Sequence, residues 1–220
     1  MGLSRRPLLG QPRQPEVGRE LGGRPEGRLN YGSYSLMAAI VTVALALPGT
    51  LDVVAVKAMA SAQEAGLYSM ASTVGKAGIL AAMTISAFTF PKIAARANRS
   101  QPYGDLMQLG LGLAGALSAV LAVFLGVTAP VLVSLVFGQD YLPGVSLLRW
   151  YSMVAIPFSL VVIVVRSHLA ADRYDSVRAM LAFTLALVAA LVAYGSEPLR
   201  VVLAFGAVSA SYLLWNALSA

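Results

Sequence analysis

Residues 106–139 read LMQLGLGLAGALSAVLAVFLGVTAPVLVSLVFGQ, a run of 34 residues without a charged side chain between Asp105 and Asp140. A helix that crosses the roughly 30 Å hydrocarbon core of a bilayer uses about 20 residues, whereas this run as one helix would extend about 51 Å. It is too long for one crossing and too short for two crossings with a turn. We expect one spanning helix over residues 106–127, broken at residues 128–130, and a short segment over residues 131–137 that lies at the outer surface or packs against its neighbours.

The composition of the whole chain agrees with a membrane protein. Of its 220 residues, 58% are hydrophobic and 12% are charged, and the mean hydropathy is +0.73. An ordinary soluble domain is about 45–50% apolar and about 25% charged, so that class is excluded. The spacing of charges predicts an all-α, polytopic bundle of six transmembrane helices, the other five lying near residues 35–56, 65–91, 143–169, 178–194 and 200–220.

The N-terminal residues 1–33 differ from the rest and contain six of the 16 basic residues, with three Glu, four Pro and seven Gly. Such a segment predicts a disordered basic tail, followed by the bundle over residues 34–220. With one crossing in residues 106–139, twelve of the basic residues lie on the same side of the membrane as this tail. The positive-inside rule makes that side cytoplasmic, along with both termini, and it explains the net charge of +6 without nucleic acid as a partner.

Few residues are available for catalysis. The chain has no cysteine and a single histidine, His168, so we expect no catalytic residue, no metal and no cofactor, and the protein is predicted not to be an enzyme. The glycines of residues 110–115 match a dinucleotide pattern, but no strand precedes them. Small residues at this spacing (Gly110/Ala114, Gly112/Ala116, and Ala71/Gly75 on another helix) instead predict close helix packing in lipid.

Charged residues inside predicted spans are the candidates for function, because they are costly in a bilayer and often mark a transport path. Asp52, Lys57, Lys76 and Arg149 are therefore predicted to line a substrate or ion pathway. For Lys76, an ion pair with Asp52 is an equally good explanation. Lys57 lies on a different helical face from Asp52 and also fits an interface.

The two arginines of the fourth span also have an alternative explanation. Arg149 precedes Trp150 and Tyr151, which resemble an outer aromatic belt, and Arg166 lies near the inner end, so both could extend their head groups to the membrane surface. If several of these charges faced one cavity, they would suit a phosphorylated or pyrophosphate-bearing ligand. Pro48, Pro130 and Pro157 predict either broken helices, as in transporters, or simple kinks.

Four segments in order along the chain resemble landmarks of one transporter family. They are LDVVAVK at residues 51–57, EAGLYSMA at residues 64–71, FPKI at residues 90–93 and VFGQDYL at residues 136–142. The chain from about residue 36 onward is similar to the C-terminal half of bacterial polysaccharide and O-antigen flippases, which move lipid-linked oligosaccharides and belong to the multidrug/oligosaccharidyl-lipid/polysaccharide exporter superfamily.

The resemblance implies one lobe of a two-lobed flippase that moves undecaprenyl-pyrophosphate-linked oligosaccharide across the bacterial cytoplasmic membrane for cell-surface polysaccharide synthesis. It also implies a second lobe, or a second copy of the chain, as a partner. Gly66, Tyr68, Pro91, Gly138 and Tyr141 are expected to be gate or motif positions, with Pro91 ending a helix at the cytoplasmic face. Two alternatives remain: an ion-coupled multidrug exporter, whose cavity would be acidic and aromatic, and a truncated or accessory membrane component without transport activity.

Overall fold

The computed structural model describes residues 31–171 and 173–219, and these residues form helices joined by short connections. In chain order the helices are α1 (Tyr31–Ala46), α2 (Pro48–Met59), α3 (Ala62–Gly75), α4 (Ala77–Ala97), α5 (Gly104–Val136), the 3-10 helix η1 (Gln139–Gly144), α6 (Val145–Ala170), α7 (Tyr174–Tyr194) and α8 (Pro198–Ser219). Most of the predicted tail lies outside the described residues, but α1 already begins at Tyr31 rather than after residue 33.

The all-α class and the membrane character agree with the sequence prediction. Four helices are long and apolar enough to cross a membrane, and a fifth crossing results if the bent pair α1 and α2 counts as one span. The apolar part of α7, Arg178–Tyr194, is shorter than these spans. Large apolar side chains point outward along α5, among them Val120, Val127 and Leu135, as expected for a helix that faces lipid.

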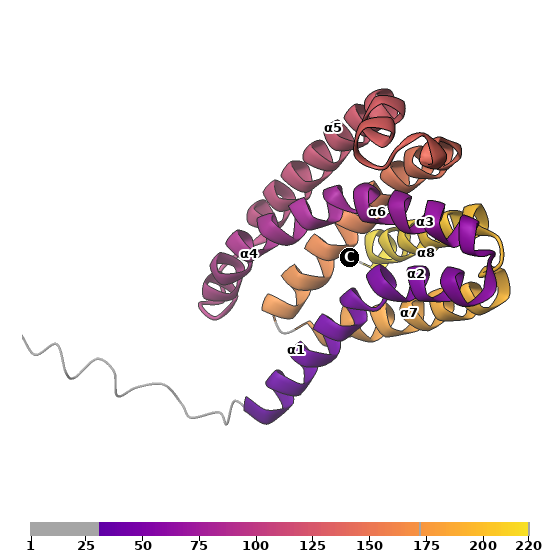
Figure 1. Cartoon of the computed structure of the whole chain (residues 1–220). Coiled ribbons are helices and arrows are strands. Elements are labelled where there is room, and N and C mark those ends of the chain that lie inside the picture. The colour runs from indigo at the N-terminus through magenta and orange to yellow at the C-terminus, as the bar shows by residue number, and fades with distance from the viewer. Residues whose placement is uncertain (1–30, 172, 220) are drawn as a thin grey trace, which may run out of the picture.

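Helix α6 lies at the centre of the bundle. It packs against α4 and α5 on one side and against α7 and α8 on the other (Figure 1). Its residues from Val161 to Val165 are buried all round, and they join the main core with Phe158 and Phe205 of α8. A helix that is apolar on all its faces is typical of a central position, because every face packs against other helices. Pro157 lies inside α6 without breaking it.

Helix α5 does not break at Pro130, so the predicted surface segment over residues 131–137 was wrong. The helix continues to Val136 because Ala129 and Val133, on either side of the proline, are both fully buried in a small core with Leu148. Proline cannot donate a hydrogen bond to the carbonyl four residues earlier, that of Gly126. The Nε atom of Arg149 donates to this carbonyl instead, at 2.9 Å.

Pro91 does not end its helix either, which corrects a second prediction. Helix α4 passes through Pro91 and continues to Ala97, and Ile93 just beyond the proline is fully buried. Burial of the following turn stabilises the helix enough to offset the single hydrogen bond that proline removes. The interruption in this span lies earlier, at Lys76, where α3 ends and α4 begins.

The first span is interrupted just before Pro48, in agreement with the broken helix that was one of the two predictions for this proline. Leu47 separates α1 from α2, and the two segments meet at an angle of 42°. Pro48 leaves the carbonyl of Ala44 without its helical donor. The hydroxyl of Thr184 on α7 lies 3.5 Å from that oxygen, and its shorter hydrogen bond, at 2.8 Å, goes to the carbonyl of Met180.

The small residues pack as expected on one face only. Gly110 is buried beside Ile163 of α6, and a Cβ atom there would lie 3.2 Å from that side chain. Ala114 is fully buried on the same face. Gly112 is exposed, so the pair of Gly112 with Ala116 does not form the predicted close contact.

Candidate functional site

A buried ion pair joins Asp52 of α2 to Lys76, the residue between α3 and α4. The Nζ atom of Lys76 lies 3.2 Å from Oδ2 of Asp52, and the Asp52 side chain is fully buried while that of Lys76 is 17% exposed. Nζ also donates to Oδ1 of Asp52 at 3.2 Å and to the carbonyl oxygen of Gly49 at 2.6 Å. The alternative in which Lys76 forms an ion pair with Asp52 thus agrees with the geometry.

Three hydroxyl groups complete the surroundings of the Asp52 carboxylate. Tyr68, Ser72 and Tyr151 all donate to Oδ2, at 3.1, 3.3 and 2.6 Å. The two tyrosine rings meet edge to face with their centroids 6.0 Å apart, and Nζ of Lys76 lies 5.5 Å from the Tyr151 ring centroid. A buried charge costs much free energy unless it is paired and hydrogen-bonded, and both conditions are met here. We call Asp52, Tyr68, Ser72, Lys76 and Tyr151 the Asp52 cluster.

The local sequence explains how these side chains meet. Tyr68, Ser72 and Lys76 follow one another at intervals of four residues, so they lie on one face of α3 and its end. The start of α3 is fixed by a capping box, in which Ser61 and Glu64 each bond to the other's backbone N–H group. The chain leaves α3 at Lys76 itself, which brings its ammonium group next to Gly49, in the first turn of α2.

Helix α6 approaches α3 closely enough for Tyr151 to contact Asp52 because residue 75 is glycine. A Cβ atom on Gly75 would lie 2.8 Å from Cδ1 of Tyr151 and 3.0 Å from its Cβ atom. Gly66 on the same helix has nothing within 4 Å of the equivalent position. The two glycines of α3 therefore differ: one allows a close contact and the other faces open space.

Replacing Gly75 by alanine is expected to push Tyr151 away from Asp52 and to lower the free energy of unfolding by about 1–3 kcal/mol, as overpacking does. Gly66→Ala is the matched control, and we expect it to be neutral or to stabilise by up to about 1 kcal/mol, since alanine favours a helix. Thermal unfolding of both purified variants in the same detergent checks this. Equal behaviour of the two variants would contradict the close contact at Gly75.

The other two candidate charges lie away from this cluster. Lys57 is exposed and has no hydrogen bond or ion pair with the described residues, so it lies on a different face from Asp52, as its spacing predicts. Arg149 is also exposed and bonds to Gly126, beside a surface groove between α5 and α6. The hypothesis that Lys57, Lys76 and Arg149 share one cationic cavity is therefore not supported by the geometry. Lys76 is paired with a carboxylate, and Arg149 donates a hydrogen bond to a carbonyl of α5.

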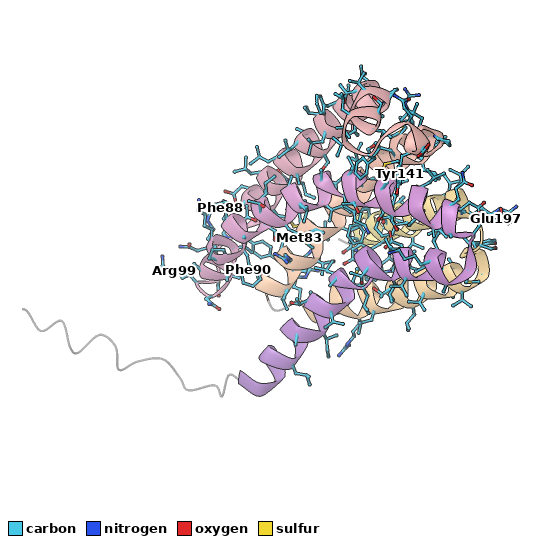
Figure 2. All side chains as sticks on the ribbon, in the orientation of Figure 1. Met83, Phe88, Phe90, Arg99, Tyr141 and Glu197 are labelled. Carbon is cyan, nitrogen blue, oxygen red and sulfur yellow. The ribbon has the colours of Figure 1, made fainter. Side chains whose placement is uncertain are left out.

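The positions taken from the family resemblance are scattered. Tyr68 is part of the Asp52 cluster rather than of a surface turn, while Gly66 is half-buried and Pro91 is exposed. Gly138 has φ of +94°, a conformation that favours glycine, and it links α5 to η1. Tyr141 in η1 is half-buried, with its ring centroid 5.9 Å from that of Phe137 (Figure 2).

Two important residues of the cluster were not predicted from the sequence. Tyr151 was expected in an aromatic belt with Trp150, but it is fully buried and makes the shortest hydrogen bond to Asp52. Neighbouring helical residues point about 100° apart, so Trp150 faces outward while Tyr151 points into the bundle. Ser72 could have been found from its place between Tyr68 and Lys76. The close helix contact at Gly75 agrees with the packing predicted from the Ala71/Gly75 spacing.

The cluster can bind charge. Asp52 is a carboxylate that can hold a proton or a cation, and Lys76 is the cation that it holds here. Among the described residues, no three His, Cys, Asp or Glu side chains gather as a metal ion would require. Comparisons with protein-family models, curated proteins and solved structures found no match to this chain.

Proposed function

We propose that this chain is one lobe of a bacterial membrane transporter that moves an isoprenoid-pyrophosphate-linked oligosaccharide across the cytoplasmic membrane. In this proposal α1 with α2, α3 with α4, α5, α6, α7 and α8 are six crossings, and both termini are cytoplasmic. In this proposal a second copy of the chain supplies the other wall of the path. The resemblance of four segments to polysaccharide flippases gives the substrate class.

The observation that carries the proposal is the Asp52 cluster beside the break in the first span. Ionisable residues inside a membrane protein are rare and commonly belong to substrate or ion paths. Transporters place such groups where helices are broken, because free backbone groups and charges can then meet a ligand near the membrane centre. Asp52 and Gly49 follow the break at Leu47, and Lys76 is the single turn residue between α3 and α4, which together form one membrane-length segment.

The same geometry suggests how a phosphate would be handled. Lys76 is 17% exposed, whereas Asp52 is fully buried, so a pyrophosphate group would reach the ammonium group before the carboxylate. Taking Lys76 from Asp52 leaves the carboxylate in need of another positive charge. A proton or a small cation bound by Asp52 would meet this need and would couple ligand binding to an ion gradient.

The surroundings of Asp52 also favour a second candidate, an ion-coupled drug exporter. Such a protein would need an acidic and aromatic site, and Asp52 is surrounded by Tyr68 and Tyr151, with Phe205 stacked on Tyr151 at a centroid distance of 6.0 Å. An exporter of this kind would bind organic cations at the carboxylate. The two candidates thus differ in which member of the ion pair contacts the transported molecule.

Complementation separates these candidates. A bacterial strain without its oligosaccharide flippase is given the chain alone, or two copies joined by a linker. Restored surface polysaccharide with either form supports the flippase, whereas restored resistance to cationic drugs in an exporter-deficient strain supports the second candidate. Failure of both forms in both strains, with normal amounts of protein in the membrane, would contradict transport and favour an accessory component.

A further inference from the structure

A half-buried arginine without a partner lies beside an apolar groove at one end of the bundle. Arg166 of α6 has no hydrogen bond or ion pair with any described residue, and burial covers part of its side chain. The groove has a volume of about 320 Å³ and lies between α1, α4 and α6. It is lined, besides Arg166, by Val41, Thr42 and Leu45 of α1, by Ala87 and Phe90 of α4, and by Leu169 of α6.

The groove lies toward the end of the bundle that carries other basic residues. Arg166 is four residues from the end of α6, which is about 6 Å along the helix axis. Figure 2 shows Phe90 on α4 with Arg99 beyond it at the same end of that helix. Lys92 and Arg99 at this end are exposed, and Arg96 is paired with Asp105. This end of the molecule therefore attracts anions at the membrane surface.

A guanidinium group keeps its charge under all ordinary conditions and offers five donors. Partly buried in a membrane protein without an acceptor, it is unfavourable, and an anion beside it would remove the cost. Apart from Arg166 and Thr42, the groove walls are aliphatic and aromatic, so a free inorganic anion would not fill them. A molecule with both a phosphate group and an acyl chain satisfies both features, because arginine binds phosphate through two parallel hydrogen bonds.

We propose that this groove binds an anionic phospholipid, with the phosphate on Arg166 and an acyl chain between α1 and α4. Basic pockets between membrane helices near the membrane surface bind such head groups in general. The site is separate from the Asp52 cluster, whose Lys76 is already paired with a carboxylate. The bound lipid holds α1 against α4 and α6, so it stabilises the segment of the first span that precedes the break at Leu47.

Native mass spectrometry and thermal unfolding of the full chain with added phosphatidylglycerol or phosphatidylcholine test the site. We expect the wild-type chain to retain phosphatidylglycerol in preference to phosphatidylcholine and to unfold at a higher temperature with it. Arg166→Gln is expected to weaken this binding about tenfold or more, as loss of a charged hydrogen bond does. Lys57→Gln removes the same charge from an exposed position on α2, away from this groove, and should leave lipid retention unchanged.

A second variant keeps the test valid if Arg166→Gln unfolds. Ala87 is exposed in the groove, and Ala87→Phe keeps the charge of Arg166 but fills the groove, so it is expected to reduce lipid retention. Equal retention of phosphatidylglycerol by the wild-type chain, Arg166→Gln and Ala87→Phe would overturn the proposal. Retention of an isoprenoid phosphate with no retention of phosphatidylglycerol would also overturn it, since the groove would then belong to a substrate path.

Discussion

Replacing Lys76 by methionine is expected to lower the free energy of unfolding by about 3 kcal/mol, near the lower end of the range for breaking a buried ion pair. Methionine has a similar length but leaves the buried Asp52 carboxylate without a positive charge. Three hydroxyl groups still donate to Asp52, which limits the loss. For a chain of this size the melting temperature is expected to fall by about 6–12 °C, measured on the purified protein in detergent.

Lys57→Met is the matched control for this prediction, because Lys57 is also a lysine of the first two spans but is exposed and unpaired among the described residues. A surface substitution of this kind usually changes stability by no more than about 0.5 kcal/mol. If Lys76→Met unfolded at the same temperature as Lys57→Met, the ion pair with Asp52 would not stabilise the protein.

The double variant Asp52→Asn with Lys76→Met is expected to be nearly as stable as the wild-type chain but inactive in transport. A neutral pair of similar volume removes both buried charges, and such replacements are often neutral or stabilising. The introduced amide would keep a carbonyl oxygen for the Tyr151 hydroxyl, so that donor would stay satisfied. Export of oligosaccharide in the complementation assay should fall to the level of cells without the gene.

This combination distinguishes a functional ion pair from a structural one. A purely structural pair predicts that the double variant recovers both stability and export. A functional pair predicts recovery of stability alone. The double variant has neither the ammonium group that would bind phosphate nor the carboxylate that would bind a coupling ion. Gly66→Ala, which is expected to keep both, is the positive control for expression and insertion into the membrane.

The sequence was sufficient for the class of fold but not for its interruptions. Long runs without charges, such as residues 106–139, indicate membrane helices because charge is costly in lipid. Proline was a poor guide to helix ends: Pro48 separates two helices, whereas Pro91, Pro130 and Pro157 lie inside continuous ones. The difference depends on tertiary partners, such as the Arg149 side chain that bonds to the Gly126 carbonyl.

For the candidate site, the sequence identified Asp52, Lys76 and Tyr68 and offered the ion pair between the first two, but not the hydroxyl groups that surround it. The first two stand out because they are charged residues in apolar segments. The contact of Asp52 with Tyr151 spans 99 positions along the chain, so no local pattern reveals it. Likewise, Arg149 and Lys76 look equivalent as intramembrane cations, and only the packing of α5 against α6 separates their roles.

The most direct measurement is translocation of a fluorescent isoprenoid-pyrophosphate oligosaccharide across vesicles that each contain several copies of the purified chain. The account predicts that the wild-type chain moves the lipid to the opposite leaflet faster than protein-free vesicles do, and that the Asp52→Asn, Lys76→Met double variant matches the protein-free rate. Translocation by the double variant at the wild-type rate, or no translocation by the wild-type chain, would contradict it.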